Sequence, residues 1–435
     1  MFSKILIANR GEIAVRIIRA CKEMGIATVA IYSTADVDSL HAALADESYC
    51  IGEAEASDSY LNQERIVSAA CLAGAQAIHP GYGFLSESAD FARLCKSNGI
   101  VFIGPSPDIM EKIGDKAKLK EQMDAASIRV IPGTMTLSSE EIAASEAEKL
   151  GYPVMLKASA GGGGRGIRLA KNSDEVRLLF PQASAEAEAA FGDGSIYLEK
   201  YIYPARHIEF QILADEAGNV VIAGERDCSL QRRHQKLVEE SPSLAVTAEM
   251  REKMQKMLCR AIRQIGYTGI GTAEFLLDAQ GTFWFMEMNI RLQVEHCVSE
   301  MLTGIDLVKW QIRIAAGISL PFRQENIRLS GTVIECRINA IGCGTVDMLH
   351  IPGGPQVRFD TYLLPGTEIL PYYDALIGKL IVCAGTREEA IRKMNAALCE
   401  LLIEGVQTNT EEQLGILDDE RFLSGTYDLD FMGNR

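Results

Sequence analysis

The chain has 435 residues, enough for about three domains of roughly 150 residues each. Hydrophobic residues make up 47% and charged residues 23%, as in ordinary globular proteins, which excludes the disordered, collagen-like and coiled-coil classes. The formal net charge is −16, so the chain repels nucleic acid, and an anionic ligand must meet a local basic cluster.

Membrane and secretory signals are not evident in the sequence. No apolar run approaches the roughly 18 residues that a membrane helix needs, and no basic region precedes an apolar core near the N-terminus. The eleven cysteines are scattered singly, without a Cys-x-x-Cys pair, which favours reduced and mostly buried thiols. The sequence therefore predicts a cytoplasmic protein with no membrane or nucleic-acid partner.

The first hundred residues alternate short apolar runs with helical periodicity. We predict strands at 4–8, 26–32, 77–78 and 100–103, and a helix at about 12–24. This alternation predicts an α/β fold with a parallel, doubly wound, Rossmann-like sheet. Residues 9–14 contain one glycine where a dinucleotide fingerprint needs three, so a nicotinamide role is not predicted.

A glycine run at residues 161–166 is the strongest local motif, with five glycines in six positions. Such a backbone can approach a ligand closely and aim its N–H groups at phosphate oxygens. Lys157 adds a cation at the end of a predicted strand. The run lacks the Gly-Lys-Ser/Thr ending of a Walker loop, and a plain surface loop is the alternative interpretation.

The central part of the chain changes in composition after residue 107. Residues 196–223 alternate like strands joined by turns. A helix is predicted at 248–265, with Thr247 as its N-cap and Gly266 as its stop. The densest basic cluster of the chain, at 226–236, is either a solvated face or the positive patch that an anionic substrate requires.

A β-hairpin is predicted at residues 269–289. In the register of a two-residue loop, Glu274 faces Phe285 and lies diagonal to Glu287, about 7–8 Å away at the backbone. Asn289 points the same way. Two carboxylates and an amide oxygen are a ligand set suited to Mg²⁺. The alternative is a solvent-facing edge hairpin, because a one-residue slip would turn Glu274 away from Glu287.

Polar side chains continue at every second position beyond this hairpin. They are Glu287, Asn289, Arg291, Gln293 and Glu295. An extended segment would line one surface with them, and a plain amphipathic strand is the alternative, although Asn, Gln and Glu are poor strand formers. A third segment opens near Gly331 with a predicted strand at 332–338 and ends in a helix near 388–403.

Together these motifs resemble one known family. Over essentially its whole length, the sequence resembles biotin carboxylase, the ATP-grasp subunit of bacterial acetyl-CoA carboxylase. The motifs that carry the resemblance, in order, are Ile7–Ala14, His79–Gly83, Gly161–Gly166, Arg232–Lys236 and Glu287–His296. The resemblance implies a Rossmann-like domain at 1–113, an α+β ATP-grasp domain with a glycine-rich lid at 114–325, and a small mixed C-terminal domain at 326–435.

The resemblance also implies roles for individual residues. ATP would contact Lys116, Lys157, Gly163, Gly164, Glu199, Lys200, Tyr201, Ile202, His207, Gln231, His234, Glu274 and Glu287. Two Mg²⁺ or Mn²⁺ ions would be held by Glu274, Glu287 and Asn289. Bicarbonate would meet Lys236, Arg291, Gln293, Val294 and Glu295, and biotin would meet Tyr82 and Arg337. The catalytic residues would be Lys236, Arg291, Arg337 and the general base Glu295.

The implied partners are a separate biotinylated carrier protein and carboxyltransferase subunits. No Met-Lys-Met occurs here to carry biotin on this chain. A homodimer is implied by Arg16, Arg19 and Glu23, whose spacing predicts one exposed helix face. Alternatives are the biotin carboxylase of another acyl-CoA carboxylase, a different ATP-grasp ligase that makes an acyl phosphate, and a catalytically silent homologue.

The chain departs from the family pattern in two places. Residues 341–345 replace an acidic-Pro step and a Phe-x-Pro-Ser-x-Gly segment, and the region to about residue 358 is several residues shorter. Cys297 stands beside the implied base where a proline is typical. These departures leave the local fold of the third domain, its contact with a carrier and the turn before residue 297 open.

Overall fold

The N-terminal segment folds around a parallel five-stranded sheet of order β3-β2-β1-β4-β5. The computed structural model describes residues 1–159 and 167–433. The strands of this sheet are β1 (Lys4–Ile7), β2 (Ala27–Ser33), β3 (Glu47–Gly52), β4 (Ala77–His79) and β5 (Val101–Phe102). The helices of the segment are α1 (Gly11–Glu23), α2 (Leu40–Leu44), α3 (Gln63–Ala73), α4 (Ala89–Ser97) and α5 (Pro107–Gly114).

Alternating apolar side chains explain why this sheet is covered on both faces. In β1, Ile5 and Ile7 pack with Ile17 of α1, whereas Leu6 packs with residues of α3 and α4. Successive strand residues point to opposite faces, so both faces need helices, which confirms the predicted doubly wound sheet. The sequence does not predict β3, because it is an edge strand with alternating exposed polar residues.

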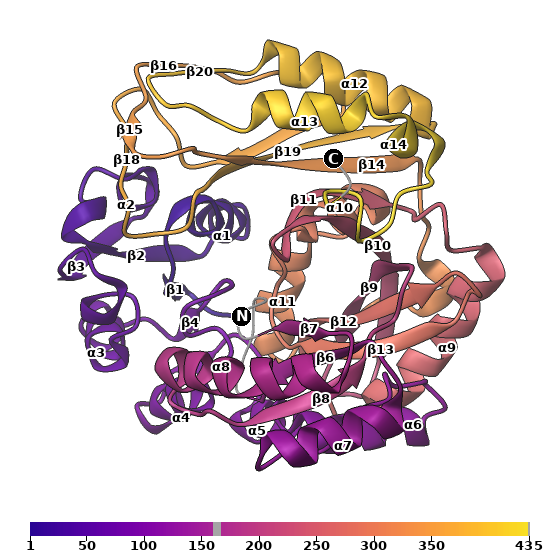
Figure 1. Cartoon of the computed structure of the whole chain (residues 1–435). Helices are drawn as coiled ribbons and strands as arrows, with labels where there is room; N and C mark the ends of the chain where they lie inside the picture. Colours follow the sequence, from indigo (N-terminus) through magenta and orange to yellow (C-terminus); the bar gives the residue numbers. More distant parts are fainter. Residues whose placement is uncertain (160–166, 434–435) are drawn as a thin grey trace.

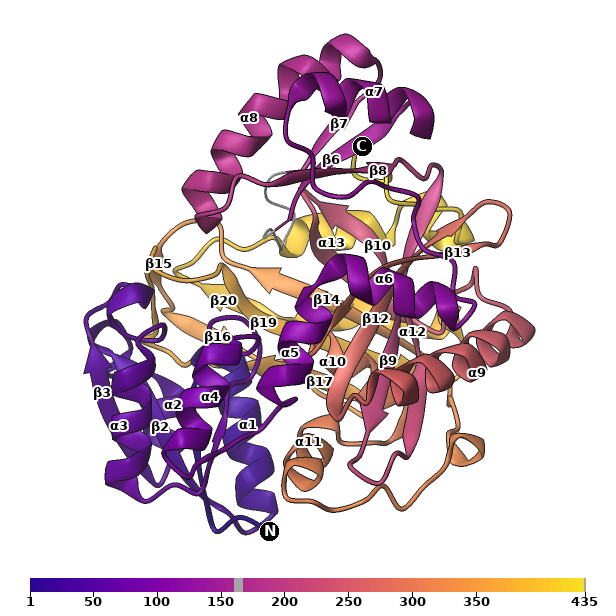
Figure 2. The same cartoon turned by 90° about the horizontal axis from the view of Figure 1, so that it is seen from below.

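A small unit follows α6 (Lys116–Ala125) and stands at the top of Figure 2, away from the N-terminal sheet. It contains α7 (Glu140–Leu150), β6 (Val154–Ala158), β7 (Arg168–Ala170), α8 (Ser173–Phe191) and β8 (Ile196–Lys200). Its sheet has the antiparallel order β7-β6-β8, and α7 and α8 pack on it. The predicted glycine run, with Gly163 and Gly164, lies outside the described residues.

An eight-stranded antiparallel sheet of order β13-β12-β9-β10-β11-β14-β19-β17 forms the rest of the framework. Its strands are β9 (Ala205–Ala214), β10 (Val220–Arg232), β11 (Gln235–Ser241), β12 (Gly269–Asp278), β13 (Phe283–Asn289), β14 (Thr332–Asn339), β17 (Val357–Thr361) and β19 (Leu376–Ala384). The helices that lie between β11 and β14 in the sequence are α9 (Ala248–Ile265), α10 (His296–Thr303) and α11 (Leu307–Ala315). The helix predicted at 248–265 is confirmed, and Thr247 accepts the predicted N-cap hydrogen bond.

The domain division at 1–113, 114–325 and 326–435 stays a prediction. The eight-stranded sheet crosses its second boundary, because β11 pairs with β14 from Val238 opposite Cys336 to Ser241 opposite Val333. The two halves of the cleft described below are therefore joined by continuous backbone hydrogen bonding.

The C-terminal segment adds two short sheets and three helices. These elements are β15 (Gly344–Thr345), β16 (Met348–His350), β18 (Glu368–Ile369), α12 (Arg387–Glu400), β20 (Leu402–Glu404), α13 (Thr410–Leu417) and α14 (Glu420–Ser424). The shortened region after residue 340 forms β15 and β16, which pair with β18 and β20. The helix predicted near 388–403 ends at Glu400, and in Figure 1 α12 and α13 cover the outer side of β14 and β19.

The face of α1 that was expected to be exposed is partly buried, which corrects the prediction for Arg16. Its side chain is only 11% exposed and forms ion pairs with Glu300 at 2.9 Å and Asp306 at 2.8 Å. Arg19 is exposed, and Glu23 pairs with Lys309. The three residues do share one face of α1, but α10 and the start of α11, which are distant in sequence, cover Arg16.

Among the described residues, no helix is long and apolar enough to cross a membrane.

Candidate active site

One cleft of about 1530 Å³ is lined by residues of the N-terminal segment, the small unit and the eight-stranded sheet. Every predicted site residue that the structure describes lines this cleft. Six of them are cations, which supply the local positive charge that this acidic chain needs to bind an anion. They are Lys116, Lys157, Lys200, Lys236, Arg291 and Arg337.

The predicted register of the β12–β13 hairpin is wrong. Phe275 lies opposite Phe285, but a bulge then places Glu274 directly opposite Glu287 instead of diagonal to it. Without the bulge, Glu274 would face Met286, so the extra residue turns the second carboxylate into the cleft. Asn289 follows on the same face of β13, as predicted, opposite Thr272.

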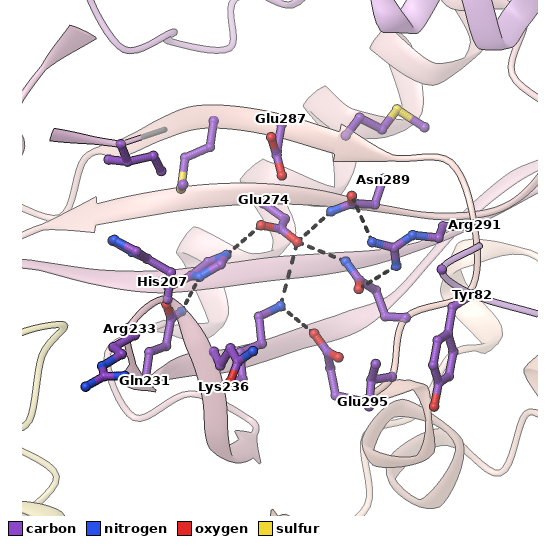
Figure 3. Close-up of a pocket in the computed structure, with 18 of the residues that line it drawn as sticks. Tyr82, His207, Gln231, Arg233, Lys236, Glu274, Glu287, Asn289, Arg291 and Glu295 are labelled. Carbon is purple, nitrogen blue, oxygen red and sulfur yellow. Dashed lines mark hydrogen bonds and ion pairs between the residues drawn. The ribbon is translucent and has the colours of Figure 1, made fainter. Parts of the chain in front are cut away.

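Four polar side chains converge on the carboxylate of Glu274 (Figure 3). Asn289 Nδ2 donates at 2.6 Å and Gln293 Nε2 at 2.9 Å to Oε1, and His207 Nε2 lies 2.9 Å from Oε2. The Lys236 ammonium lies 3.7 Å from Oε1. Burial alone would raise the pKa of Glu274, but Lys236 and His207 lower it well below its usual range. This carboxyl group is therefore ionised.

The opposite carboxyl, Glu287, is perturbed in the other direction. Burial and the neighbouring charge of Glu274 raise its pKa, against the effect of Lys116 and Lys157. A divalent cation between the two carboxylates would offset this repulsion. Together with the amide oxygen of Asn289, the two carboxylates form a hard-oxygen ligand set that fits Mg²⁺.

The chain does not remain extended from Glu287 to Glu295, which corrects the second strand prediction. β13 ends at Asn289, and Glu295 already occupies the N-cap position of α10. Arg291 and Gln293 nevertheless reach the cleft from the intervening turn. Arg291 Nη1 donates to Gln293 Oε1 at 2.9 Å, and its Nε donates to Glu87 at 3.1 Å.

Glu295 is the most enclosed carboxylate facing the cleft, with 1% of its surface exposed. It pairs with the Lys236 ammonium and, at 2.9 Å, with Nη2 of Arg337. Burial would raise the pKa of Glu295, but Lys236, Arg337 and Arg226 lower it well below its usual range. The Glu295 carboxylate is therefore ionised and lies between the two cations.

The basic cluster at 226–236 is divided between the interior and the cleft, where Arg232, Arg233 and Lys236 supply part of the predicted positive charge. It forms the β10–β11 hairpin, in which Arg226 is fully buried and paired with Glu209, while Lys236 reaches the cleft and also binds Glu209 at 2.7 Å. Glu209 was not predicted from the sequence. It is the lone carboxylate within β9, but its partners Arg226 and Lys236 lie on β10 and β11.

The tip of this hairpin has a strained backbone. Arg233 and His234 have φ values of +50° and +65°, the left-handed region that two-residue hairpin turns usually fill with Asn-Gly. Each such residue costs about 1–3 kcal/mol. Burial and the charge of Lys157 lower the pKa of His234, so the imidazole at this tip is neutral at pH 7.

At the opposite end of the cleft, Glu199 holds two cations. Lys157 and Lys120 both form ion pairs with it, and Lys120 was not predicted from the sequence. Lys200 Nζ donates to two backbone carbonyls near the start of β6, at 2.6 and 3.1 Å. Tyr201 stacks on Tyr203 at a centroid distance of 5.8 Å. This end offers both cations and a flat aromatic surface.

Cys297 lies in the first turn of α10, two residues after the N-cap Glu295. It is the second residue of that helix, a position where proline is also tolerated. Its buried thiol donates to Asp360 Oδ2 at 3.2 Å, and Asp360 is in turn held by Arg358. Burial raises the pKa of this thiol, so the cysteine is a protonated packing residue here.

Comparisons with known proteins agree with this architecture. Three family models match in succession: "Biotin carboxylase, N-terminal domain" over residues 1–110, "Carbamoyl-phosphate synthase L chain, ATP binding domain" over 115–323, and "Biotin carboxylase C-terminal domain" over 336–434. Biotin carboxylase 1 of Bacillus subtilis is 50% identical over 442 residues, covering 99% of this chain and 98% of the relative.

Two solved structures are similar over the whole chain. The biotin carboxylase domain dimer of Hydrogenobacter thermophilus 2-oxoglutarate carboxylase, solved with MgADP, ADP and bicarbonate, has a TM-score of 0.97 and 50% identity, covering 100% of this chain and 98% of that chain. The biotin carboxylase of Campylobacter jejuni in a nucleotide complex has a TM-score of 0.98 and 46% identity, covering 100% and 99%.

The fold, the cleft and the matching ATP-binding domain place the chain in the ATP-grasp class of ATP-dependent ligases. Within that class, the chain belongs to the biotin carboxylase family, whose enzymes use ATP and bicarbonate. The fold class and the family predicted from the sequence are both confirmed.

Proposed function

We propose that this chain carboxylates biotin on a separate carrier protein, as the first half-reaction of acetyl-CoA carboxylase in fatty acid synthesis. The observation that carries the proposal is Glu295, held between Lys236 and Arg337 beside Arg291. A bicarbonate ion that binds Lys236 and Arg291 would lie next to this buried carboxylate. The second candidate is the corresponding subunit of another carboxylase, because a structure of comparable similarity belongs to a 2-oxoglutarate carboxylase.

The first step is phosphoryl transfer from ATP to bicarbonate. Glu295 accepts the bicarbonate proton, and the carbonate oxygen attacks the γ-phosphorus as the bond to ADP breaks, which gives carboxyphosphate and ADP. Lys116 and Lys157, which line the cleft, would bind the nucleotide phosphates. Glu274, Glu287 and Asn289 would hold Mg²⁺, which neutralises phosphate charge when it is bound.

The second step is carboxylation of biotin. Carboxyphosphate breaks into CO₂ and phosphate, phosphate takes the N–H proton of biotin, and the nitrogen attacks CO₂. Negative charge develops on the ureido oxygen, where the Arg337 guanidinium is proposed to stabilise it. Tyr82, whose hydroxyl donates to Glu12, would form part of the biotin subsite.

ADP release measured with and without bicarbonate, and with and without free biotin, tests this function. Stimulation by bicarbonate and formation of carboxybiotin are expected. A different ATP-grasp ligase would instead turn over ATP only with an amino acid or another carboxylate, and a silent homologue would turn over none. The cytoplasm is the proposed compartment, since most of the cysteines are buried free thiols.

Biotin itself should be attached to another protein. We expect the intact mass of the purified chain to equal that of its sequence, because no Met-Lys-Met acceptor occurs in it. A streptavidin blot of the same cell extract supplies the control, since a biotinylated carrier should react there while this chain does not. Covalent biotin on the purified chain would refute the separate-carrier proposal.

A homodimer is proposed in solution, as in the solved structure of the Hydrogenobacter domain, which is a dimer. Sedimentation at micromolar concentration is expected to give about twice the 47.5 kDa chain mass. Arg19→Glu reverses an exposed charge on α1 and is expected to weaken the dimer, whereas Arg263→Glu on α9 is the remote control. A species with the monomer mass at every micromolar concentration would contradict the proposal.

A further inference from the structure

A buried lysine joins the three parts of the chain just behind the cleft. Lys379 lies on β19 and is 0% exposed. Its ammonium forms an ion pair with Glu12 Oε1 of α1 at 3.0 Å and donates a hydrogen bond to the backbone carbonyl of Val294 at 2.8 Å. Val294 belongs to the turn that precedes α10, the turn that brings Gln293 and Glu295 to the cleft.

The strand register relates this lysine to Arg337. Lys379 lies directly opposite Arg337 in the β14–β19 pair, so both side chains leave the same face of the sheet. Arg337 binds the carboxylate of Glu295 at 2.9 Å, and Lys379 binds the carbonyl one residue earlier. Two adjacent cations of one rigid sheet therefore hold both the side chain and the backbone of the proposed base.

The surroundings of Lys379 keep it charged despite its burial. Burial lowers the pKa of Lys379, but the charge of Glu12 beside the ammonium opposes this effect, and the pKa of Lys379 lies above its usual range. The ammonium also lies 6.0 Å from the centre of the Tyr82 ring, within reach of a cation–π interaction.

A buried ion pair is weak evidence for a stabilising role, because apolar residues of similar volume are often equally stable. An apolar residue at position 379 would, however, leave the Val294 carbonyl without this donor. The function specific to lysine is thus the orientation of the turn.

We propose that Lys379 is a positioning residue for the bicarbonate site, which fixes the 293–295 turn through the Val294 carbonyl and keeps Glu295 in reach of the bound substrate. This role rests on the proposed function of the cleft. A base displaced by about 1 Å typically loses about 10²-fold in rate. The nucleotide end of the cleft, around Glu199, depends on other strands and should not respond.

The test is the variant Lys379→Met in bicarbonate-dependent ATP hydrolysis without biotin. We expect kcat/KM for bicarbonate to fall about 10²-fold, while the Kd for ADP stays within about twofold of wild type. Arg387→Met is a matched control, because Arg387 is also a buried cation that binds one carboxylate, Glu240, and two backbone carbonyls, but away from the cleft. It is expected to lower Tm without changing the bicarbonate parameters.

A second variant separates positioning from stability. Lys379→Met combined with Glu12→Gln removes both charges of the pair and is expected to regain Tm relative to Lys379→Met alone. Its kcat/KM for bicarbonate should stay low, because the donor to Val294 is still absent. Recovery of Tm and activity together, or a bicarbonate effect no larger than that of Arg387→Met, would overturn the proposal. If wild-type protein itself shows no bicarbonate-dependent turnover, the function of the cleft fails instead.

Discussion

Glu295→Gln is expected to lower both bicarbonate-dependent ATP hydrolysis and biotin carboxylation by about 10²–10⁴-fold, the usual contribution of a general base. The amide keeps the shape of the side chain but cannot accept the bicarbonate proton. Both reactions lose rate, because carboxyphosphate formation precedes carboxylation. Binding of ADP should be nearly normal, since Lys157 and Glu199 lie at the other end of the cleft. Initial rates with saturating ATP, together with ADP titration calorimetry, measure these effects.

The matched control is Glu300→Gln. Glu300 is also a buried carboxylate that pairs with two arginines, Arg16 and Arg358, but it does not line the cleft. It should lose stability without a selective loss of bicarbonate turnover. Full bicarbonate-stimulated ATP hydrolysis by Glu295→Gln would show that the base has been assigned to the wrong residue.

Arg337→Met is expected to slow carboxylation far more than ATP hydrolysis. Removal of one donor to a developing oxyanion costs about 10²–10³-fold, or about 3–4 kcal/mol of barrier. The loss should fall on biotin carboxylation, where the ureido oxygen becomes negative. Phosphoryl transfer should fall less, because Lys236 still binds Glu295. Parallel measurement of carboxybiotin and ADP gives the ratio of the two rates.

The pH profile of the same variant adds an independent test. Arg337 stabilises the ionised form of Glu295 and so lowers its pKa. Removing the guanidinium should raise that pKa, so the acid limb of ATP hydrolysis should move to higher pH. Arg206→Met is the control, since Arg206 is equally buried, at 13% against 14% exposed, and pairs with Asp227 away from the cleft. If both activities and Tm fall together with an unmoved pH limb, Arg337 is a structural residue.

Local patterns predicted much of the framework. The strand β1 and the helix α1 follow from uninterrupted and periodic apolar residues, and α9 ends where Thr247 and Gly266 mark its limits. These features depend on neighbours in sequence, so sequence alone defines them. The assembly of residues from 82 to 337 into one cleft followed only from the family resemblance.

The features that were predicted wrongly or not at all share a different cause. The hairpin loop is one residue longer than predicted, because Asp278 pairs with Thr282. A single extra residue at Met286 then shifts the partner of Glu274 once more, and no residue type marks such a bulge in advance. Arg16 has the spacing of an exposed position, but its partner Glu300 is hundreds of residues away. Glu209 and Lys379 are charged residues within apolar strands, which signals a buried ion pair. Their partners depend on tertiary packing and could not be predicted.

The pairing of β11 with β14 limits how this enzyme can be divided. A fragment that ended before Gly331 would leave the backbone of Val238–Ser241 as an open strand edge. Such an edge is a template for aggregation unless charge or proline protects it. The ATP-binding half is therefore a poor stand-alone module. Gene fusions and recombination between relatives would have to preserve the β14 register, which ties the β12–β13 hairpin and Arg337 together as one inherited unit.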